Sequence, residues 1–212
     1  MSSNQSFQIV LGSSSPRRRE LLAMVTPDFT VIKPETAEVP RPGEPAEDYV
    51  VRNAREKAEW IADATNTDQV SRLIISADTI VVHDGVILEK PIDAPDAVRM
   101  LSMLSNTTHR VVTGVHLIAA RSGDRPRAEQ RRVAAFVVAT EVTFKALTRA
   151  EIDFYIATGE PFDKAGGYAA QGRGSWFVKR VNGSWSNVVG LPMAELVTAA
   201  EREFGIVLWK QA

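Results

Sequence analysis

The sequence FQIVLGSSSPRRRELL, from Phe7 to Leu22, decides how the fold begins and suggests a ligand. An apolar run ends in three serines, and Pro16 then fits the first position of a helix, because no backbone N–H is needed there. Three arginines follow in the first turn, where the helix dipole already presents positive charge. Backbone amides, serine hydroxyls and guanidinium groups together are typical of a phosphate site. Taken alone, the segment is explained equally well by a solvated basic helix start after an ordinary serine cap.

The composition is that of a globular α/β protein. With 212 residues, the chain can form one sizeable domain with two lobes, and we expect a single domain over residues 1–212. The 25 Lys and Arg against 26 Asp and Glu give a net charge of -1, which favours neither nucleic acid nor membrane as a partner. The chain lacks cysteine, a signal peptide and any apolar run of about 20 residues, so we expect it in the cytoplasm.

Apolar periodicity and turn residues predict the elements. Asp84-Gly85 is a strong hairpin signal between two of the strands. The predicted strands are Phe7–Leu11, Phe29–Lys33, Leu73–His83, Val86–Leu88, Arg110–Ala120, Val133–Leu147 and Ser175–Val181. The predicted helices are Pro16–Val25, Ala46–Ala64, Ala94–Leu104, Glu151–Thr158 and Pro192–Phe204. Helices between hairpins favour a mixed α/β or α+β architecture over a doubly wound parallel sheet.

One polar pair breaks the apolar pattern of a strand. Asp78-Thr79 interrupts LIISADTIVV, which otherwise predicts a near-continuous buried strand. Burying an isolated carboxylate is costly unless it is paired or binds a metal ion. A structural salt bridge or a strand bulge would explain Asp78, but the pattern favours an active-site carboxylate.

Other candidate residues are ambiguous when each is taken alone. Lys57 shares an apolar helix face, where a lysine usually extends its ammonium to solvent. Lys90 resembles a surface lysine, and Glu38 lies in a proline-rich acidic loop, where carboxylates commonly serve solubility. The glycine-rich segment Gly159–Gly174 is different, because its length and its interspersed polar residues, Gln171 among them, are typical of a binding loop.

Taken together, these residues resemble the Maf family of nucleoside triphosphate pyrophosphatases, first associated with septum formation. The resemblance runs from about Phe7 to Leu196. It is carried by motifs in the family's order: Ser13-x-Ser15-Pro16-Arg17-Arg18, Arg55-Glu56-Lys57-Ala58, Ala77-Asp78-Thr79, Glu89-Lys90-Pro91, Thr113-Gly114-Val115, Asp163-Lys164-Ala165-Gly166, Gln171-Gly172 and Val189-Gly190-Leu191-Pro192.

The resemblance implies the Maf/inosine-triphosphatase-like fold, a mixed twisted sheet with helices in two lobes around a nucleotide cleft. It implies hydrolysis of a nucleoside triphosphate to the monophosphate and pyrophosphate, with Asp78 as proton acceptor. The three positions that separate the subfamilies fall on Arg17, Thr79 and Gln171. These residues resemble the dTTP/UTP pyrophosphatase branch, whereas the 7-methyl-GTP branch tends to carry tryptophan, glutamine and glutamate.

On this interpretation Ser13, Arg17, Thr79 and Gln171 bind substrate, and Asp78, Glu38, Lys57 and Lys90 form the catalytic set. Glu38 and Asp78 would also hold a divalent cation such as Mg²⁺ or Mn²⁺, because carboxylates suit hard ions. The amide of Gln171 can pair with the O4/N3 edge that uracil and thymine share.

Two other classes of function stay open. A non-catalytic triphosphate-binding regulator of cell division is the main alternative, although it would not need the intact set of carboxylates and lysines. An RNA-binding module would use the arginines after Pro16 and the basic loop Arg121–Arg132, which has no match in the family pattern. Modified pyrimidine triphosphates as substrates, the identity of the metal and a homodimer are also left open.

Overall fold

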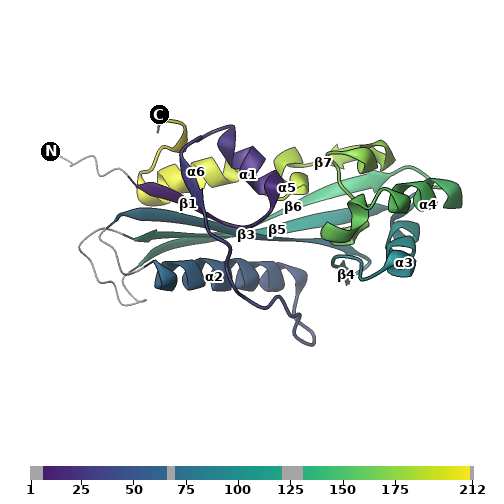
Figure 1. Cartoon of the computed structure of the whole chain (residues 1–212), viewed down its shortest axis with the longest axis horizontal. Helices are drawn as coiled ribbons and strands as arrows, with labels where there is room; N and C mark the ends of the chain where they lie inside the picture. Colours follow the sequence, from purple (N-terminus) through teal and green to yellow (C-terminus); the bar gives the residue numbers. More distant parts are fainter. Residues whose placement is uncertain (1–6, 66–69, 121–130, 211–212) are drawn as a thin grey trace. The chain divides into compact units, whose positions relative to one another are not determined.

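The computed structural model describes residues 7–65, 70–120 and 131–210. Within them, seven strands form one mixed sheet (Figure 1). The order along the sheet is β2 (Phe29–Val31), β1 (Gln8–Gly12), β3 (Arg72–His83), β5 (Thr108–Ala120), β6 (Arg132–Phe144) and β7 (Val178–Asn182), with β4 (Val86–Leu88) paired to β3.

The chain divides into two compact units. Unit 1 contains the described residues within Met1–Asp78, Gly114–Val137 and Gly190–Ala212. Unit 2 contains Thr79–Thr113 and Val138–Val189. Strands β3, β5 and β6 therefore contribute residues to both units. The mixed α/β architecture is confirmed, because β1 pairs in parallel with β2 and β3, whereas β4 pairs antiparallel with β3 and β7 with β6.

Unit 1 contains three neighbouring parallel strands of the mixed sheet. Strand β1 lies between β2 and β3, and all three strands are parallel. Parallel neighbours require crossover connections, which here contain α1 (Pro16–Ala23) and α2 (Ala46–Ala64). Helix α2 covers one face of these strands, and α1 and α6 (Met193–Phe204) cover the other (Figure 1). The sheet as a whole is nevertheless mixed, as predicted, because β4 and β7 pair antiparallel with their neighbours.

Two glycines allow α2 to lie directly on the sheet. A Cβ atom on Gly12 of β1 would come within 2.5 Å of the Ile61 side chain and 2.2 Å of Ser76 Oγ. A Cβ atom on Gly114 of β5 would lie 2.5 Å from the carbonyl carbon of Val50. Ile61 and Val50 stand on the same buried face of α2, with Lys57 between them along the helix. The two glycines therefore set how closely α2 approaches the sheet, and with it the distance between Lys57 and the strands.

An apolar cluster holds α2 in this place. It joins α2 to β1, β3 and β5, and every member is almost fully buried. Its residues are Val10, Ala58, Ile61, Ala62, Ile74 and Ile118, with Trp60 packed at the margin. The apolar spacing that predicted α2 is thus the spacing of its buried face.

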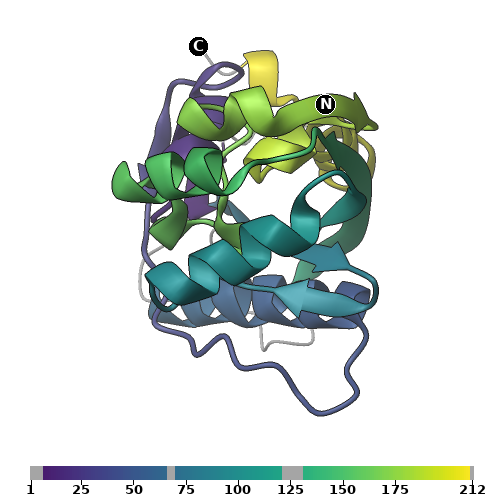
Figure 2. The same cartoon turned by 90° about the vertical axis from the view of Figure 1, so that its right-hand side faces the viewer.

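Unit 2 is built around the β3–β4 hairpin and an aromatic core. Asp84 and Gly85 both have positive φ, 48° and 78°, as expected for the predicted two-residue turn. Figure 2 shows α3 (Ala94–Leu104, teal) and α4 (Arg149–Ala157, green), which pack against each other. The core includes the rings of Phe144, Tyr155, Tyr168 and Phe177.

The glycine-rich segment of unit 2 is more regular than predicted. Residues 159–174 contain the short 3-10 helices η2 (Glu160–Asp163) and η3 (Ala165–Gly167) and the start of η4 (Arg173–Phe177). The predicted strand from Ser175 begins only at Val178, because η4 occupies the preceding residues. The short helix α5 (Trp185–Val189) was not predicted at all.

The remaining element predictions are confirmed, with ends that differ by at most three residues, and α2, β4 and α3 match to the residue. Strands β5 and β6, which follow each other in the sequence, are neighbours in the sheet. Most of the loop predicted between them, Arg121–Arg132, lies outside the described residues. Within the described chain, no helix combines the length and apolar character that crossing a bilayer would require.

Candidate functional site

The centre of the candidate site is the ammonium group of Lys57. Its Nζ lies 2.7 Å from Oδ1 of Asp78 and 2.7 Å from Oε1 of Glu38. Lys57 and Asp78 are buried, whereas the Glu38 side chain is 42% exposed. Lys57 therefore does not extend to solvent, as a lysine on an apolar face usually does, but joins two carboxylates from distant parts of the sequence.

The carboxylate of Asp78 is held at both oxygens. Lys57 donates to Oδ1, and Nδ2 of Asn53 donates to Oδ2 at 2.9 Å. Asn53 and Lys57 are four residues apart on α2 and therefore lie on the same helix face. The salt bridge that could explain Asp78 structurally is therefore present. Its partner is Lys57, which is itself one of the predicted catalytic residues. These hydrogen bonds are what allow a carboxylate to be buried.

Asn53 is a site residue that the sequence analysis missed. It is 1% exposed, and its Oδ1 has no hydrogen-bond partner among the described residues. Asparagine normally favours helix caps and turns over helix interiors. Its presence in the middle of α2 was therefore a usable signal of a specific role. The spacing of four residues before Lys57 would have placed it beside the lysine.

Ser13 and Arg18 form a second part of the site, at the start of α1. Oγ of Ser13 accepts from the Ser15 amide at 3.2 Å and from Nη1 of Arg18 at 3.1 Å. Nε of Arg18 donates to the carbonyl of Gly190 at 2.8 Å. The serine-rich turn is therefore ordered around one guanidinium group, and the carbonyl of Gly190 ties that group to the segment before α6.

The electrostatics of Arg18 connect this turn to the carboxylates. Burial lowers the pKa of Arg18, whereas the charges of Asp78 and Glu38 act to raise it and the neighbouring Arg17 acts to lower it. The sequence analysis assigned substrate binding to Arg17 and gave Arg18 no role of its own. Both arginines belong to the same electrostatic environment, so Arg18 is a second site residue that was missed.

The position of this group in the fold is typical of a ligand site. The chain runs from β1 through α1 to β2 on one side, and then through α2 to β3 on the other. Such a reversal leaves a crevice outside the carboxyl ends of the strands. Ser13 directly follows β1, and Asp78 lies two residues beyond Ser76, the partner of Gly12 at the end of β1.

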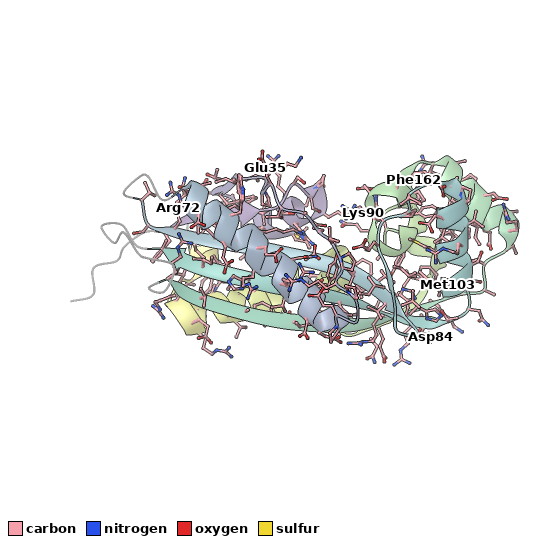
Figure 3. All side chains as sticks on the ribbon, turned by 90° about the horizontal axis from the view of Figure 1, so that it is seen from below. Glu35, Arg72, Asp84, Lys90, Met103 and Phe162 are labelled. Atoms are coloured by element: carbon pink, nitrogen blue, oxygen red, sulfur yellow. The ribbon has the colours of Figure 1, made fainter. Side chains whose placement is uncertain are left out.

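The other predicted site residues belong to unit 2. Oγ1 of Thr79 lies 3.0 Å from Oγ1 of Thr113, so these two hydroxyls share a hydrogen bond. Lys90, labelled in Figure 3, and Gln171 are exposed. Unit 1 thus joins Glu38, Lys57 and Asp78 by direct ion pairs, and Arg18 links Ser13 to the charges of the two carboxylates. The participation of Thr79, Lys90 and Gln171 around the same substrate stays a prediction.

A network in unit 2 fixes the segment that carries Gln171. The carboxylate of Glu160 accepts from the amides of Arg173 and Gly174 at 3.0 and 3.1 Å, and from the Tyr155 hydroxyl at 2.9 Å. The same hydroxyl accepts from the Ala169 amide at 3.0 Å. Burial raises the pKa of Glu160, but these hydrogen bonds outweigh it, and its pKa lies below the usual value. Both flanks of Gln171 are therefore anchored.

Comparison with known proteins identifies relatives along nearly the whole chain. The sequence profile of the family described as Maf-like protein matches residues 8–203. A dTTP/UTP pyrophosphatase of Anaeromyxobacter dehalogenans is 47% identical over 204 residues, which cover 96% of this chain and 98% of the relative. A dTTP/UTP pyrophosphatase of Geobacter sulfurreducens is 46% identical over 195 residues, 92% and 96% of the two chains.

Two solved structures show a weaker likeness. A nucleoside-triphosphatase / dITP/XTP pyrophosphatase from Mycobacterium abscessus aligns with 66% of this chain and 76% of its own, at 16% identity and a TM-score of 0.39. The Ham1 protein of Staphylococcus aureus aligns with 64% and 72% of the two chains, at 19% identity and a TM-score of 0.38. At these scores the likeness carries no argument. The profile match and the identity to curated relatives over almost their full length decide the assignment, and the chain belongs to the family of Maf-like proteins.

Proposed function

We propose that this chain hydrolyses dTTP and UTP to the nucleoside monophosphate and pyrophosphate. The relatives named as dTTP/UTP pyrophosphatases support the reaction, since they are 44–48% identical over 91–96% of the chain. The observation that carries the proposal is the buried carboxylate of Asp78, which is bound by Lys57 and Asn53 at the carboxyl ends of parallel strands.

Asp78 is the proton acceptor in this proposal. A water molecule attacks the α-phosphorus, a new P–O bond forms, and the bond from the α-phosphorus to the bridging oxygen of pyrophosphate breaks. The water proton passes to an oxygen of Asp78, and the leaving pyrophosphate retains the electron pair. Hydrogen bonds to both oxygens fix the orientation of the carboxylate, which a general base needs for proton transfer.

The cations near Asp78 would bind the phosphates. Arg17 and Arg18 stand in the first turn of α1, where helix amides also point toward an anion. Guanidinium groups bind phosphate oxygens in pairs, and positioned charge is the main source of rate in phosphoryl transfer. Lys57 holds the two carboxylates and has a third N–H that it could donate to the substrate.

The residues present fit a divalent cation. Within the described residues there is no group of three or more His, Cys, Asp or Glu side chains that could form a closed metal site. Mg²⁺ does not need one, because it commonly binds through one or two carboxylates, water and the phosphates of a substrate. Glu38 and Asp78 supply those two carboxylates and would hold it. When bound, the cation would neutralise charge that develops on the phosphate oxygens.

Gln171 and Thr79 would select the base. The Gln171 amide carries both a donor and an acceptor, which match the O4/N3 edge shared by uracil and thymine. Cytosine reverses that pattern, so it should be disfavoured when the bound substrate holds the amide in one orientation. The anchors at Tyr155 and Glu160 support this role, because a side chain that reads a base must be held in place.

The first experiment measures pyrophosphate release from dTTP, UTP, CTP and GTP with Mg²⁺. We expect UMP and pyrophosphate from UTP, and a loss of at least about 100-fold in kcat for Asp78→Asn, the low end for a general base. Asp84→Asn is the matched control, because Asp84 is an exposed turn residue in the same strand pair. Products of UDP and phosphate, or near-normal activity of Asp78→Asn, would contradict the proposal.

A second experiment tests base selection. Gln171→Glu removes the amide donor and keeps the length of the side chain, so we expect the ratio of kcat/KM for UTP over CTP and GTP to fall. An unchanged ranking of the four nucleotides would count against a base-reading role for Gln171. It would leave the chemistry at Asp78 intact.

A further inference from the structure

Arg52 of α2 is a buried cation whose side chain is directed at the loop that carries Glu38. The side chain is 9% exposed, and its guanidinium group grips Glu44 with two parallel hydrogen bonds, Nε to Oε1 at 2.6 Å and Nη2 to Oε2 at 2.7 Å. Nη2 also donates to the carbonyl of Val39 at 3.0 Å, and Nη1 lies 3.4 Å from Glu56. One side chain therefore contacts the loop at two separate points.

The loop has little regular structure that could hold it otherwise. Fourteen residues separate the end of β2 at Val31 from the start of α2 at Ala46, and none of them is in a helix or strand. A turn closes at its far end, where the Arg41 amide donates to Glu44 Oε2 at 3.1 Å and the Glu44 amide to the Arg41 carbonyl at 3.0 Å. Glu44 is thus fixed within the loop, and Arg52 fixes Glu44 to the helix.

The charges of the pair are strongly coupled. The hydrogen bonds from Arg52 lower the pKa of Glu44 to about 2, and those from Glu44 raise the pKa of Arg52 above its usual value. A paired guanidinium and carboxylate of this geometry gives directional as well as electrostatic restraint.

Glu38 depends on this restraint. It directly precedes Val39, whose carbonyl Arg52 holds, and its side chain reaches Lys57 at 2.7 Å although it is 42% exposed. Arg52 and Lys57 stand on the same helix, so the helix holds both the loop backbone and the carboxylate that the loop carries.

We propose that Arg52 is a positioning residue that holds Glu38 over Lys57 and so prepares Glu38 as a ligand for the divalent cation. The proposal rests on the metal-binding role given to Glu38 above. Arg52 does not touch the reacting atoms. Partners of this kind behind a metal ligand usually contribute about 10- to 100-fold to metal affinity or activity.

The test compares Arg52→Lys with Arg55→Lys. Both substitutions keep the positive charge. Only Arg52→Lys removes a pair of parallel hydrogen bonds, those to Glu44, because Arg55 is exposed and its ion pair with Glu59 is a longer contact, at 3.9 Å. The readouts are the affinity for Mn²⁺ by calorimetry, the Mg²⁺ concentration that gives half-maximal pyrophosphate release, and hydrogen exchange over residues 34–45. Circular dichroism checks that each variant is folded.

We expect Arg52→Lys to weaken Mn²⁺ binding by about tenfold, to raise the Mg²⁺ requirement similarly and to speed exchange in the loop. Glu44→Gln should reproduce these changes, and Arg55→Lys should not. The decisive measurement is made in a Glu38→Gln background, where Arg52→Lys should cause no further loss of Mn²⁺ affinity, because its effect passes through Glu38.

Two results would overturn the proposal. One is Mn²⁺ affinity in Arg52→Lys equal to that in Arg55→Lys. The other is a full additional loss of Mn²⁺ affinity in the Glu38→Gln background, which would show that the effect of Arg52 does not pass through Glu38. If the wild-type chain released no pyrophosphate from UTP, the proposed function would fail, but the Mn²⁺ and exchange measurements would still decide the role of Arg52.

Discussion

Replacing Lys57 by methionine should destabilise the protein because it leaves Asp78 buried without its cation. Methionine keeps the length and apolar character of the stem, so the packing of α2 changes little. The Asp78 side chain is only 8% exposed, whereas Glu38 is 42% exposed and can be hydrated after the change. The cost therefore comes almost entirely from Asp78.

The magnitude follows from the contacts that remain. Removing one partner of a buried ion pair typically costs about 3–5 kcal/mol. Asn53 still donates to the second oxygen of Asp78, which favours the low end, so we expect a loss of about 3 kcal/mol in the free energy of unfolding. For a chain of this size, that corresponds to a decrease of roughly 6–12 °C in Tm.

Urea unfolding monitored by tryptophan fluorescence provides the assay, because Trp60 packs at the margin of the α2 cluster and reports on unit 1. The double variant Lys57→Met/Asp78→Asn should recover about 2 kcal/mol, since it removes the unpaired charge and keeps an amide of the same shape. Arg55→Met, which breaks an exposed pair, should stay within about 1 kcal/mol of the wild type. A stable Lys57→Met variant, or a double variant less stable than the single one, would refute the reasoning.

Three further predictions concern the supports of the site. Asn53→Ala removes the hydrogen bond to Oδ2 of Asp78, so kcat for UTP should fall by about tenfold and the free energy of unfolding by about 1–3 kcal/mol; an unchanged kcat would show that Asn53 does not orient the carboxylate. Gly114→Ala places a methyl group 2.5 Å from the backbone of Val50 and should cost about 1–3 kcal/mol in urea unfolding. Glu44 stabilises the folded state above its ordinary pKa of 4.5, and this contribution is lost as the pH falls toward 2, so thermal unfolding of Glu44→Gln should depend less on pH across that interval.

The sequence predicted the elements well wherever local pattern and packing agree. Helix α2 was predicted to the residue because its apolar positions follow the helical period over five turns, and these positions are the buried ones. The segment 159–174 was not, because its 3-10 turns depend on Glu160 accepting amide protons from residues 13 and 14 positions away. Such contacts leave no periodic signal, and glycines alone suggest a loop.

The candidate site was predictable in part, for a related reason. Asp78 was conspicuous because a carboxylate interrupts an apolar strand, but Lys57 could not be told from a lysine that extends to solvent until β3 was found opposite it. Asn53, Arg18 and Arg52 act through hydrogen bonds to residues 8 to 172 positions away. In the sequence alone Arg52 is an ordinary polar residue, and the weak signals at Asn53 and Arg18 do not name their partners.

The balance of charge bears on how a chain of net charge -1 would bind the triphosphate of the proposed function. In unit 1, the cations of Arg17, Arg18 and Lys57 face the carboxylates of Glu38 and Asp78, which leaves a single positive charge. A triphosphate carries roughly four negative charges at neutral pH. A divalent cation on the two carboxylates and the predicted approach of Lys90 would supply three more positive charges. On the proposed function, the carboxylates that weaken the site for the bare nucleotide would thus make it selective for the nucleotide that arrives with its metal ion.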